Sequence, residues 1–180
     1  MRWFALFTLV LAGSFAGCEK NSPAPVAPAT PAASGQPLQP ALPTKAQPTL
    51  KTIRLWLGPE ELMTELALTA EQEQTGLMFR TNLEENAGML FVFPRSIQAS
   101  FWMKNCFLPL SAAYINPEGN IVEIHDLKPQ DTNSVMAASD NVQYVLEVSQ
   151  GWFLRHHIAE GTWVRTEFGT LQETFFRQRR

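Results

Sequence analysis

The uneven distribution of proline constrains most strongly what this chain can fold into. Eight of its 13 prolines lie between Glu19 and Leu50, beside seven alanines and without a single aromatic residue. Such a segment has too little apolar surface to offset the entropy lost on ordering. Proline also favours the extended polyproline II conformation, with ~3.1 Å per residue. We therefore expect residues 19–50 to form a disordered, extended tether, and a folded domain only after it.

The first 18 residues have the pattern of a secretory signal peptide. A basic residue, Arg2, precedes an apolar run from Trp3 to Ala12, which is too short to span a bilayer stably. The segment ends in Phe-Ala-Gly-Cys, which resembles the cleavage site of bacterial lipoproteins. Cys18 is therefore the predicted lipidation site, and several acyl chains such as palmitate would anchor the protein firmly. An ordinary cleaved signal peptide with an incidental cysteine is the alternative.

This leader also predicts the location of the protein. We expect an exported protein that is lipid-anchored to a membrane and faces the periplasm. Glu19 follows the cysteine, where an aspartate is associated with retention in the inner membrane. The outer membrane is therefore the favoured location.

Residues 51–180 have the length of a normal single domain. They hold 15 of the 19 aromatic residues of the chain, so they can build an apolar core. Their 11 basic and 16 acidic residues give a net negative charge. Such a domain is not attracted to nucleic acid or to an anionic surface, so nucleic acid is not an expected partner.

Short β-type segments dominate this domain. The apolar run Gly88–Phe93 predicts a strand buried on both faces. A turn with proline and glycine at residues 116–120 predicts a hairpin. Further expected strands are Thr52–Leu57, Met63–Leu68, Ser100–Met103, Gln143–Val148 and Gly161–Glu167, and the expected helices are Ala70–Met78 and Gly151–His157. We predict a mainly β fold: a small antiparallel β-sandwich or partly open barrel with one or two short helices.

Familiar catalytic motifs are absent from the sequence, including G-x-S-x-G, H-E-x-x-H, a phosphate-binding glycine loop and paired C-x-x-C. The adjacent His156 and His157 point in different directions and His125 is isolated, so we expect neither a metal site nor a cofactor. Cys106 follows Lys104, whose ammonium group can lower the pKa of a thiol. We nevertheless expect Cys106 to be a small, partly buried residue rather than a nucleophile.

Four sequence blocks carry a resemblance to a known family. They are Gly76–Arg80 (GLMFR), Gly88–Phe93 (GMLFVF), Phe101–Leu110 (FWMKNCFLPL) and Tyr144–Glu147 (YVLE). In this order they resemble the domain-of-unknown-function family 192 (DUF192), from about Leu66 to Glu167. The resemblance implies a single, mostly β domain that is often exported or lipid-anchored, and it carries over no established activity.

The chain departs from the family pattern at three positions. Cys106 replaces a usual threonine, Ser111 replaces a usual aspartate, and Gln74 stands where arginine is common. A cysteine nucleophile is therefore not a general mechanism of the family. If the threonine and aspartate formed a catalytic pair, this chain would be impaired.

A polar set within these blocks is the candidate site. Arg80 and Lys104 could hold a carboxylate or phosphate, with Asn105 orienting it and Trp102 forming an apolar wall. A structural role is the alternative, because a buried Glu147 must be paired and Arg80 or Lys104 is its obvious partner.

The favoured function is a cell-envelope module that binds a small anionic ligand or an envelope protein. One alternative is a periplasmic hydrolase or transferase that uses Glu147 as a base beside Lys104 and Arg80. The other is a purely structural envelope protein.

Replacing the predicted lipidation site tests the anchor. We expect Cys18→Ser to move the protein from the membrane fraction to the soluble periplasmic fraction, because the acyl chains can no longer be attached. Immunoblots of the separated fractions measure this change. Unchanged membrane fractionation of the variant contradicts the lipid anchor.

Overall fold

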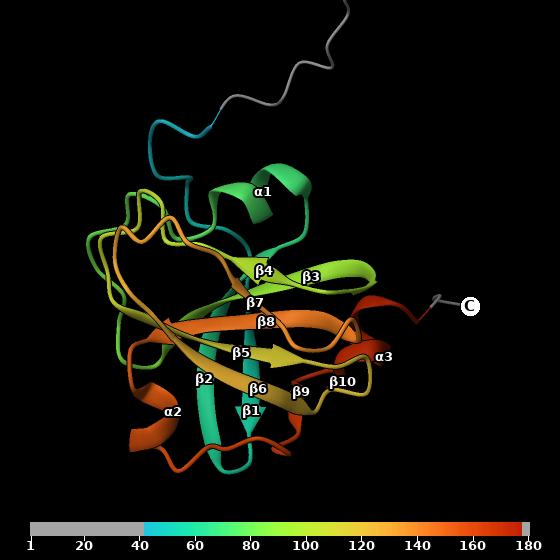
Figure 1. The fold of residues 1–180 in the computed structure, drawn as a ribbon. Helices are drawn as coiled ribbons and strands as arrows, with labels where there is room; N and C mark the ends of the chain where they lie inside the picture. Colours follow the sequence, from blue (N-terminus) through green and yellow to red (C-terminus); the bar gives the residue numbers. More distant parts are fainter. Residues whose placement is uncertain (1–41, 178–180) are drawn as a thin grey trace, which may run out of the picture. The chain divides into compact units, whose positions relative to one another are not determined.

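The computed structural model describes residues 42–177 (Figure 1). The predicted lipidation site Cys18 and most of the predicted tether lie outside the described residues. Within them the mainly β prediction is confirmed, with ten strands and three short helices. The strands are β1 Thr52–Leu57, β2 Glu60–Ala67, β3 Ala87–Ile97, β4 Ser100–Phe101, β5 Leu110–Ile115, β6 Ile121–Leu127, β7 Val135–Met136, β8 Val142–Ser149, β9 Val164–Thr166 and β10 Gly169–Thr170; the helices are α1 Ala70–Thr75, α2 Trp152–Arg155 and α3 Leu171–Phe175.

Eight of these strands form one curved sheet in the order β10-β9-β1-β2-β3-β8-β5-β6, which is not closed into a barrel. Strands β4 and β7 pair separately. All neighbours are antiparallel except β2 and β3, which are parallel. The sequence predicts antiparallel pairs only. Strands β2 and β3 are parallel because α1 and the segment after it carry the chain from the end of β2 back to the edge of the sheet where β2 begins, as a parallel connection requires.

Alternating side chains of the central strands build two cores, one on each face of the sheet. In β3, Leu90 and Val92 belong to the first core, whereas Met89, Phe91 and Phe93 belong to the second. The prediction of a strand buried on both faces is therefore confirmed. Helices α2 and α3 pack against the first core, and the segment after α1 packs against the second.

Helix α1 begins as its sequence predicts and ends earlier. The Thr69 hydroxyl accepts a hydrogen bond from the Gln72 amide at 3.3 Å, and the Gln72 side chain accepts one from the Thr69 amide at 3.2 Å. This capping box satisfies amides that the first helical turn leaves free. Gly76 takes a φ of 47°, which ends the helix at Thr75 rather than near Met78. Among the described residues, no helix is long and apolar enough to cross a membrane.

The predicted hairpin is also present as β5 and β6. Its turn is closed by a 2.9 Å hydrogen bond from the Gly119 amide to the Asn116 carbonyl. The Asn116 side chain accepts a second bond from the Asn120 amide at 2.8 Å. Local turn chemistry thus fixes the register of this strand pair.

Contacts with the domain begin before Lys51. The Gln47 side chain donates to the Gly76 carbonyl at 2.9 Å, and the Leu50 amide donates to the Glu65 carboxylate at 2.7 Å. The last residues of the predicted tether are therefore fastened to the domain.

Strands β3 and β8 approach each other closely at Gly88. A Cβ atom at this position would lie 2.6 Å from the Glu147 carbonyl oxygen and 3.2 Å from a methyl group of Val148. Both neighbours belong to a buried central strand, which cannot move away without disturbing two cores. Glycine is therefore required here, and the close approach fixes the position of Glu147.

We expect Gly88→Ala to destabilise the domain by about 3 kcal/mol, because the added methyl group meets backbone. Gly58→Ala is the matched control. Gly58 has a φ of 61° but open space around it, so its substitution incurs only the backbone cost of about 1–2 kcal/mol. Urea unfolding followed by circular dichroism measures both. A smaller loss for Gly88→Ala than for Gly58→Ala contradicts a tight contact between β3 and β8 at Gly88.

Candidate functional site

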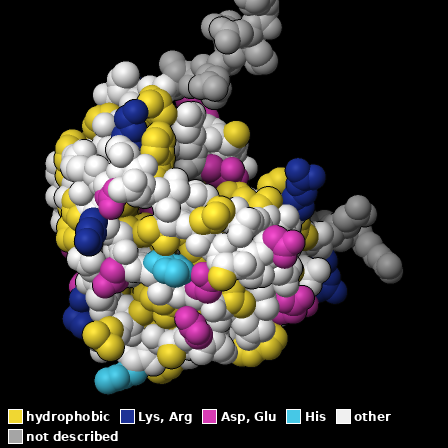
Figure 2. Space-filling view, in the orientation of Figure 1, with side chains coloured by type: hydrophobic (Ala, Val, Ile, Leu, Met, Phe, Trp, Pro, Cys, Tyr) yellow, Lys and Arg dark blue, Asp and Glu magenta, His cyan; other side chains and the backbone are white. Residues whose placement is uncertain are grey.

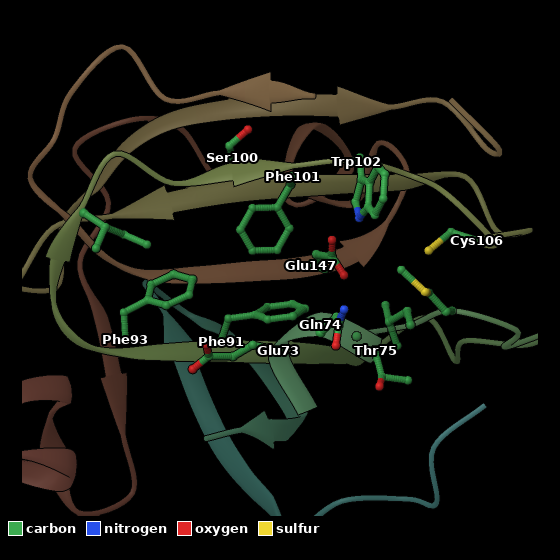
Figure 3. A pocket seen from close by; sticks show the side chains of 14 residues that line it. Glu73, Gln74, Thr75, Phe91, Phe93, Ser100, Phe101, Trp102, Cys106 and Glu147 are labelled. Carbon is green, nitrogen blue, oxygen red and sulfur yellow. The ribbon is translucent and has the colours of Figure 1, made fainter. Parts of the chain in front are cut away.

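A pocket of about 250 Å³ opens between the second core and the segments that cover it (Figure 3). This volume is below the ~300–1,000 Å³ usual for drug-sized ligands, so it suits a small molecule. The lining side chains come from helix α1 and the turn after it, from strands β3, β4 and β8, and from residues 102–106. These are Glu73, Gln74, Thr75, Gly76, Leu77, Met78, Phe91, Phe93, Ile97, Ser100, Phe101, Trp102, Cys106 and Glu147.

Aromatic rings form much of the pocket wall. Phe91 and Phe101 meet edge to face, with centroids 4.9 Å apart and an interplanar angle of 85°. Trp102 is 36% exposed and lies at the rim. A Cβ atom at Gly76 would come within 3.2 Å of the Phe91 ring, so glycine at this position leaves room for that ring.

Glu147 lies at the centre of the pocket. It is paired across the sheet with Met89 of β3 and Ala112 of β5, and only 4% of the residue is exposed. Its carboxyl group points into the pocket (Figure 3). No other residue in 42–177 forms a hydrogen bond or an ion pair with it. Burial raises the pKa of Glu147 to about 8, so this group is mostly a neutral carboxylic acid at pH 7.

All four blocks that resemble the DUF192 pattern contribute to this pocket. The first supplies Gly76, Leu77 and Met78, and the second supplies two phenylalanines of β3. The third supplies Phe101, Trp102 and Cys106, and the last supplies Glu147. The model of the DUF192 family, described as "Uncharacterized ACR", matches residues 55–166. The chain belongs to this family.

Two solved structures are similar to this DUF192 domain. One is a proposed transcription regulator from Sinorhizobium meliloti 1021, with 30% identity and a TM-score of 0.64; the match covers 67% of this chain and 98% of that chain. The other is a protein of unknown function from Novosphingobium aromaticivorans DSM 12444, with 29% identity and a TM-score of 0.63; it covers 67% and 90%, respectively. No curated protein matches the chain.

Neither Arg80 nor Lys104 pairs with Glu147 in the structure. The structural alternative predicts such a pair and is therefore wrong on this point. The Arg80 guanidinium lies 2.9 Å from the Glu65 carboxylate and also approaches the Pro48 carbonyl at 3.5 Å. Glu65 of β2 also accepts a hydrogen bond from the Leu50 amide. Arg80 therefore fastens the entering chain. The Lys104 ammonium lies over the Trp102 ring, 5.4 Å from its centroid.

Asn105 acts through its backbone in this structure. Its carbonyl accepts a 2.8 Å hydrogen bond from the Phe79 amide, which joins the turn after α1 to residues 101–106. Both residues have a left-handed backbone, with φ of 59° at Asn105 and 61° at Phe79. Such conformations cost roughly 1–3 kcal/mol each and persist where surrounding packing fixes them. This bond holds two walls of the pocket together.

Cys106 lines the pocket as a buried thiol. Burial, and secondarily the charge of Glu147, raises the pKa of Cys106 to about 12. The thiol is therefore protonated at neutral pH and is not an activated nucleophile. Burial, followed by the charges of Glu147 and Glu123, also raises the pKa of Tyr114. The Tyr114 hydroxyl donates a hydrogen bond to the Val135 carbonyl at 2.7 Å.

Ser111 has a structural role. It is 1% exposed, donates to the Asp126 carboxylate at 2.5 Å and accepts a bond from the Gly151 amide at 2.9 Å. These bonds join β5 to β6 and to the start of α2, away from the pocket. Across residues 42–177, no group of three His, Cys, Asp or Glu side chains is arranged to hold a metal ion.

Sequence reasoning missed several pocket residues. Glu73, Thr75 and Ser100 gave no signal, because only the folded chain brings α1 and β4 to the same cavity. Gln74 stands out in the sequence only as a departure from the family pattern. The period-two alternation of β3 did contain a usable signal, since it places Phe91 and Phe93 on one face.

The raised pKa of Glu147 predicts a loss of stability at high pH. The folded state keeps a proton that the unfolded chain releases above the ordinary pKa of 4.5. Stability therefore falls as the pH rises from about 5 to about 9, by about 4 kcal/mol. Glu147→Gln has no proton to lose at this position, so most of this dependence should disappear.

Urea unfolding at pH 5, 7 and 9 measures the effect. Glu160→Gln, at an exposed site outside the pocket, is the control and should keep the dependence of the wild type. Equal pH dependence in the wild type and Glu147→Gln contradicts the neutral buried acid.

Proposed function

We propose that this protein is a lipid-anchored envelope module whose DUF192 domain binds a small molecule in the pocket. The observation that carries this proposal is the unpaired Glu147 carboxyl group, buried at the centre of a preformed cavity. A buried polar group without a partner is unfavourable, and such groups concentrate where a ligand completes their hydrogen bonds. The aromatic wall provides the apolar surface that most small-molecule sites use.

The charges around the pocket argue against the anionic ligand that the sequence suggested. The lining residues include two acids, Glu73 and Glu147, and neither lysine nor arginine among the described residues. Arg80 is already paired with Glu65, so it is not free to hold an anion. A partner protein could reach Glu147 only by inserting a single side chain, because the cavity is small.

An enzyme is the second candidate. A carboxyl group with a pKa of about 8 in a cavity is suited to general acid–base catalysis near neutral pH. The expected helpers are not in place, since neither Lys104 nor Arg80 lines the pocket and Cys106 is a protonated thiol. Turnover that is lost in a well-folded Glu147→Gln variant would favour this candidate over simple binding.

The proposed location rests on the signal-peptide pattern, on Cys18 and on the Pro/Ala-rich segment. An extended tether would hold the domain away from the membrane to which the lipid attaches. The Sinorhizobium neighbour is a proposed transcription regulator. We do not extend that role to this chain, because the folded region is acidic. On the face in Figure 2, acidic and basic side chains are interspersed rather than gathered into a basic patch.

Blocking the pocket tests the binding function. Thermal-shift screening of the full chain against small polar metabolites should give ligands that raise the melting temperature by several degrees. Gln74 lines the pocket and is half-buried, so Gln74→Trp should fill the cavity and abolish these shifts (Figure 3). Ser134→Trp is the control, because Ser134 is exposed but lies outside the pocket. Ligands that stabilise Gln74→Trp as strongly as the wild type contradict binding at this site.

A further inference from the structure

We infer that the ligand of this pocket is a small organic cation, whose ammonium group binds between the Glu147 carboxylate and the aromatic wall. This inference rests on the proposed binding function and specifies its ligand class.

The first argument is the geometry of the carboxyl group. The backbone of Glu147 is held by strand pairs on both sides and by the close approach at Gly88, so its side chain stays on the pocket face of the sheet. Its carboxyl group points into the cavity, and it has no partner among the described residues (Figure 3). An ammonium group in the cavity would supply both a counter-charge and hydrogen-bond donors.

The second argument is the wall that faces it. Phe91, Phe101 and Trp102 present rings to the cavity, and the negative face of an aromatic ring attracts cations. Trp102 already takes part in this interaction, since the Lys104 ammonium lies 5.4 Å from its ring centroid. The combination of aromatic rings with a carboxylate is the general chemistry by which alkylammonium ions are bound.

The third argument is the charge of the other groups around Glu147. Glu73 of α1 is a second acid in the lining, and burial raises its pKa. Cys106 and Tyr114 carry no charge at neutral pH, because burial raises the pKa of both. The Lys104 ammonium lies over the Trp102 ring and does not line the cavity. A cationic ligand would therefore meet attraction, and an anion repulsion.

Binding of a cation must release a proton from the neutral Glu147. The ligand ammonium replaces this proton as the partner of the carboxylate, and the proton goes to the solvent, so charge is balanced. Only the ionised fraction of Glu147 is competent to bind, so affinity should rise about ten-fold between pH 7 and pH 9. An uncharged ligand that accepts a hydrogen bond from the neutral acid would show the opposite trend.

Three probes of similar size separate the ligand classes: tert-butylammonium, its uncharged analogue tert-butanol, and the anion pivalate. Isothermal titration calorimetry would use the full chain in nanodiscs whose only lipid is phosphatidylglycerol, so that no headgroup carries an ammonium. Protein-free nanodiscs give the blank. At pH 9 we expect tert-butylammonium to bind at least about ten-fold more tightly than either of the other probes. At pH 7, where Glu147 is mostly protonated, titration in buffers of different ionisation enthalpy should detect the released proton.

Two variants test the assignment to Glu147. Glu147→Gln should remove both the preference for the cation and the proton release. Gln74→Arg should weaken cation binding by at least ten-fold, because Gln74 lines the same cavity and a guanidinium there would pair with Glu147. Ser134→Trp should behave as the wild type.

Tight binding of tert-butanol or pivalate, or an affinity for tert-butylammonium that falls as the pH rises, overturns the cation assignment. If none of the probes binds while other ligands give shifts that Gln74→Trp abolishes, the pocket remains a binding site and only the cation class is wrong. If nothing gives such shifts, the proposed binding function fails as well.

Discussion

The structure depends on the close pairing of two buried central strands, β3 and β8. Side chains from both strands enter both cores, so neither strand can shift without disturbing the two faces of the sheet. Gly88 permits an approach that any larger residue would prevent. Because β8 is fixed in this way, Glu147 must lie on the face of the second core, although a carboxyl group is poorly suited to it.

Local signals predicted much of the fold. The capping box at Thr69 and Gln72 begins α1, and the turn chemistry at Asn116 closes a hairpin. These features depend on residues that are close in sequence, so the sequence alone contains them. The parallel pairing of β2 with β3 was not predicted, because it depends on how the chain crosses the sheet rather than on any pattern in either strand.

The candidate site was predictable only in part, because some of its side chains contact other residues than those that the sequence suggested. Trp102 and Glu147 lie in the pocket, whereas Arg80 pairs with Glu65 and not with Glu147. At Cys106 the sequence offered a nearby ammonium that would lower the thiol pKa. Burial has the larger effect because Lys104 lies near the surface over Trp102, where water screens its charge. Burial and exact distances, which decided both outcomes, are properties of the folded chain.

Several features that reduce stability lie around the pocket that contains Glu147. Phe79 and Asn105 have unfavourable backbone conformations, and the bond between them joins two walls of the pocket. Glu147 is an unpaired acid in a position where an apolar side chain would pack better. Two well-packed cores can tolerate these losses, but packing alone gives no reason to retain them. A sequence that breaks local rules in a well-packed fold has often done so for function, and the unpaired Glu147 places such a break in the pocket.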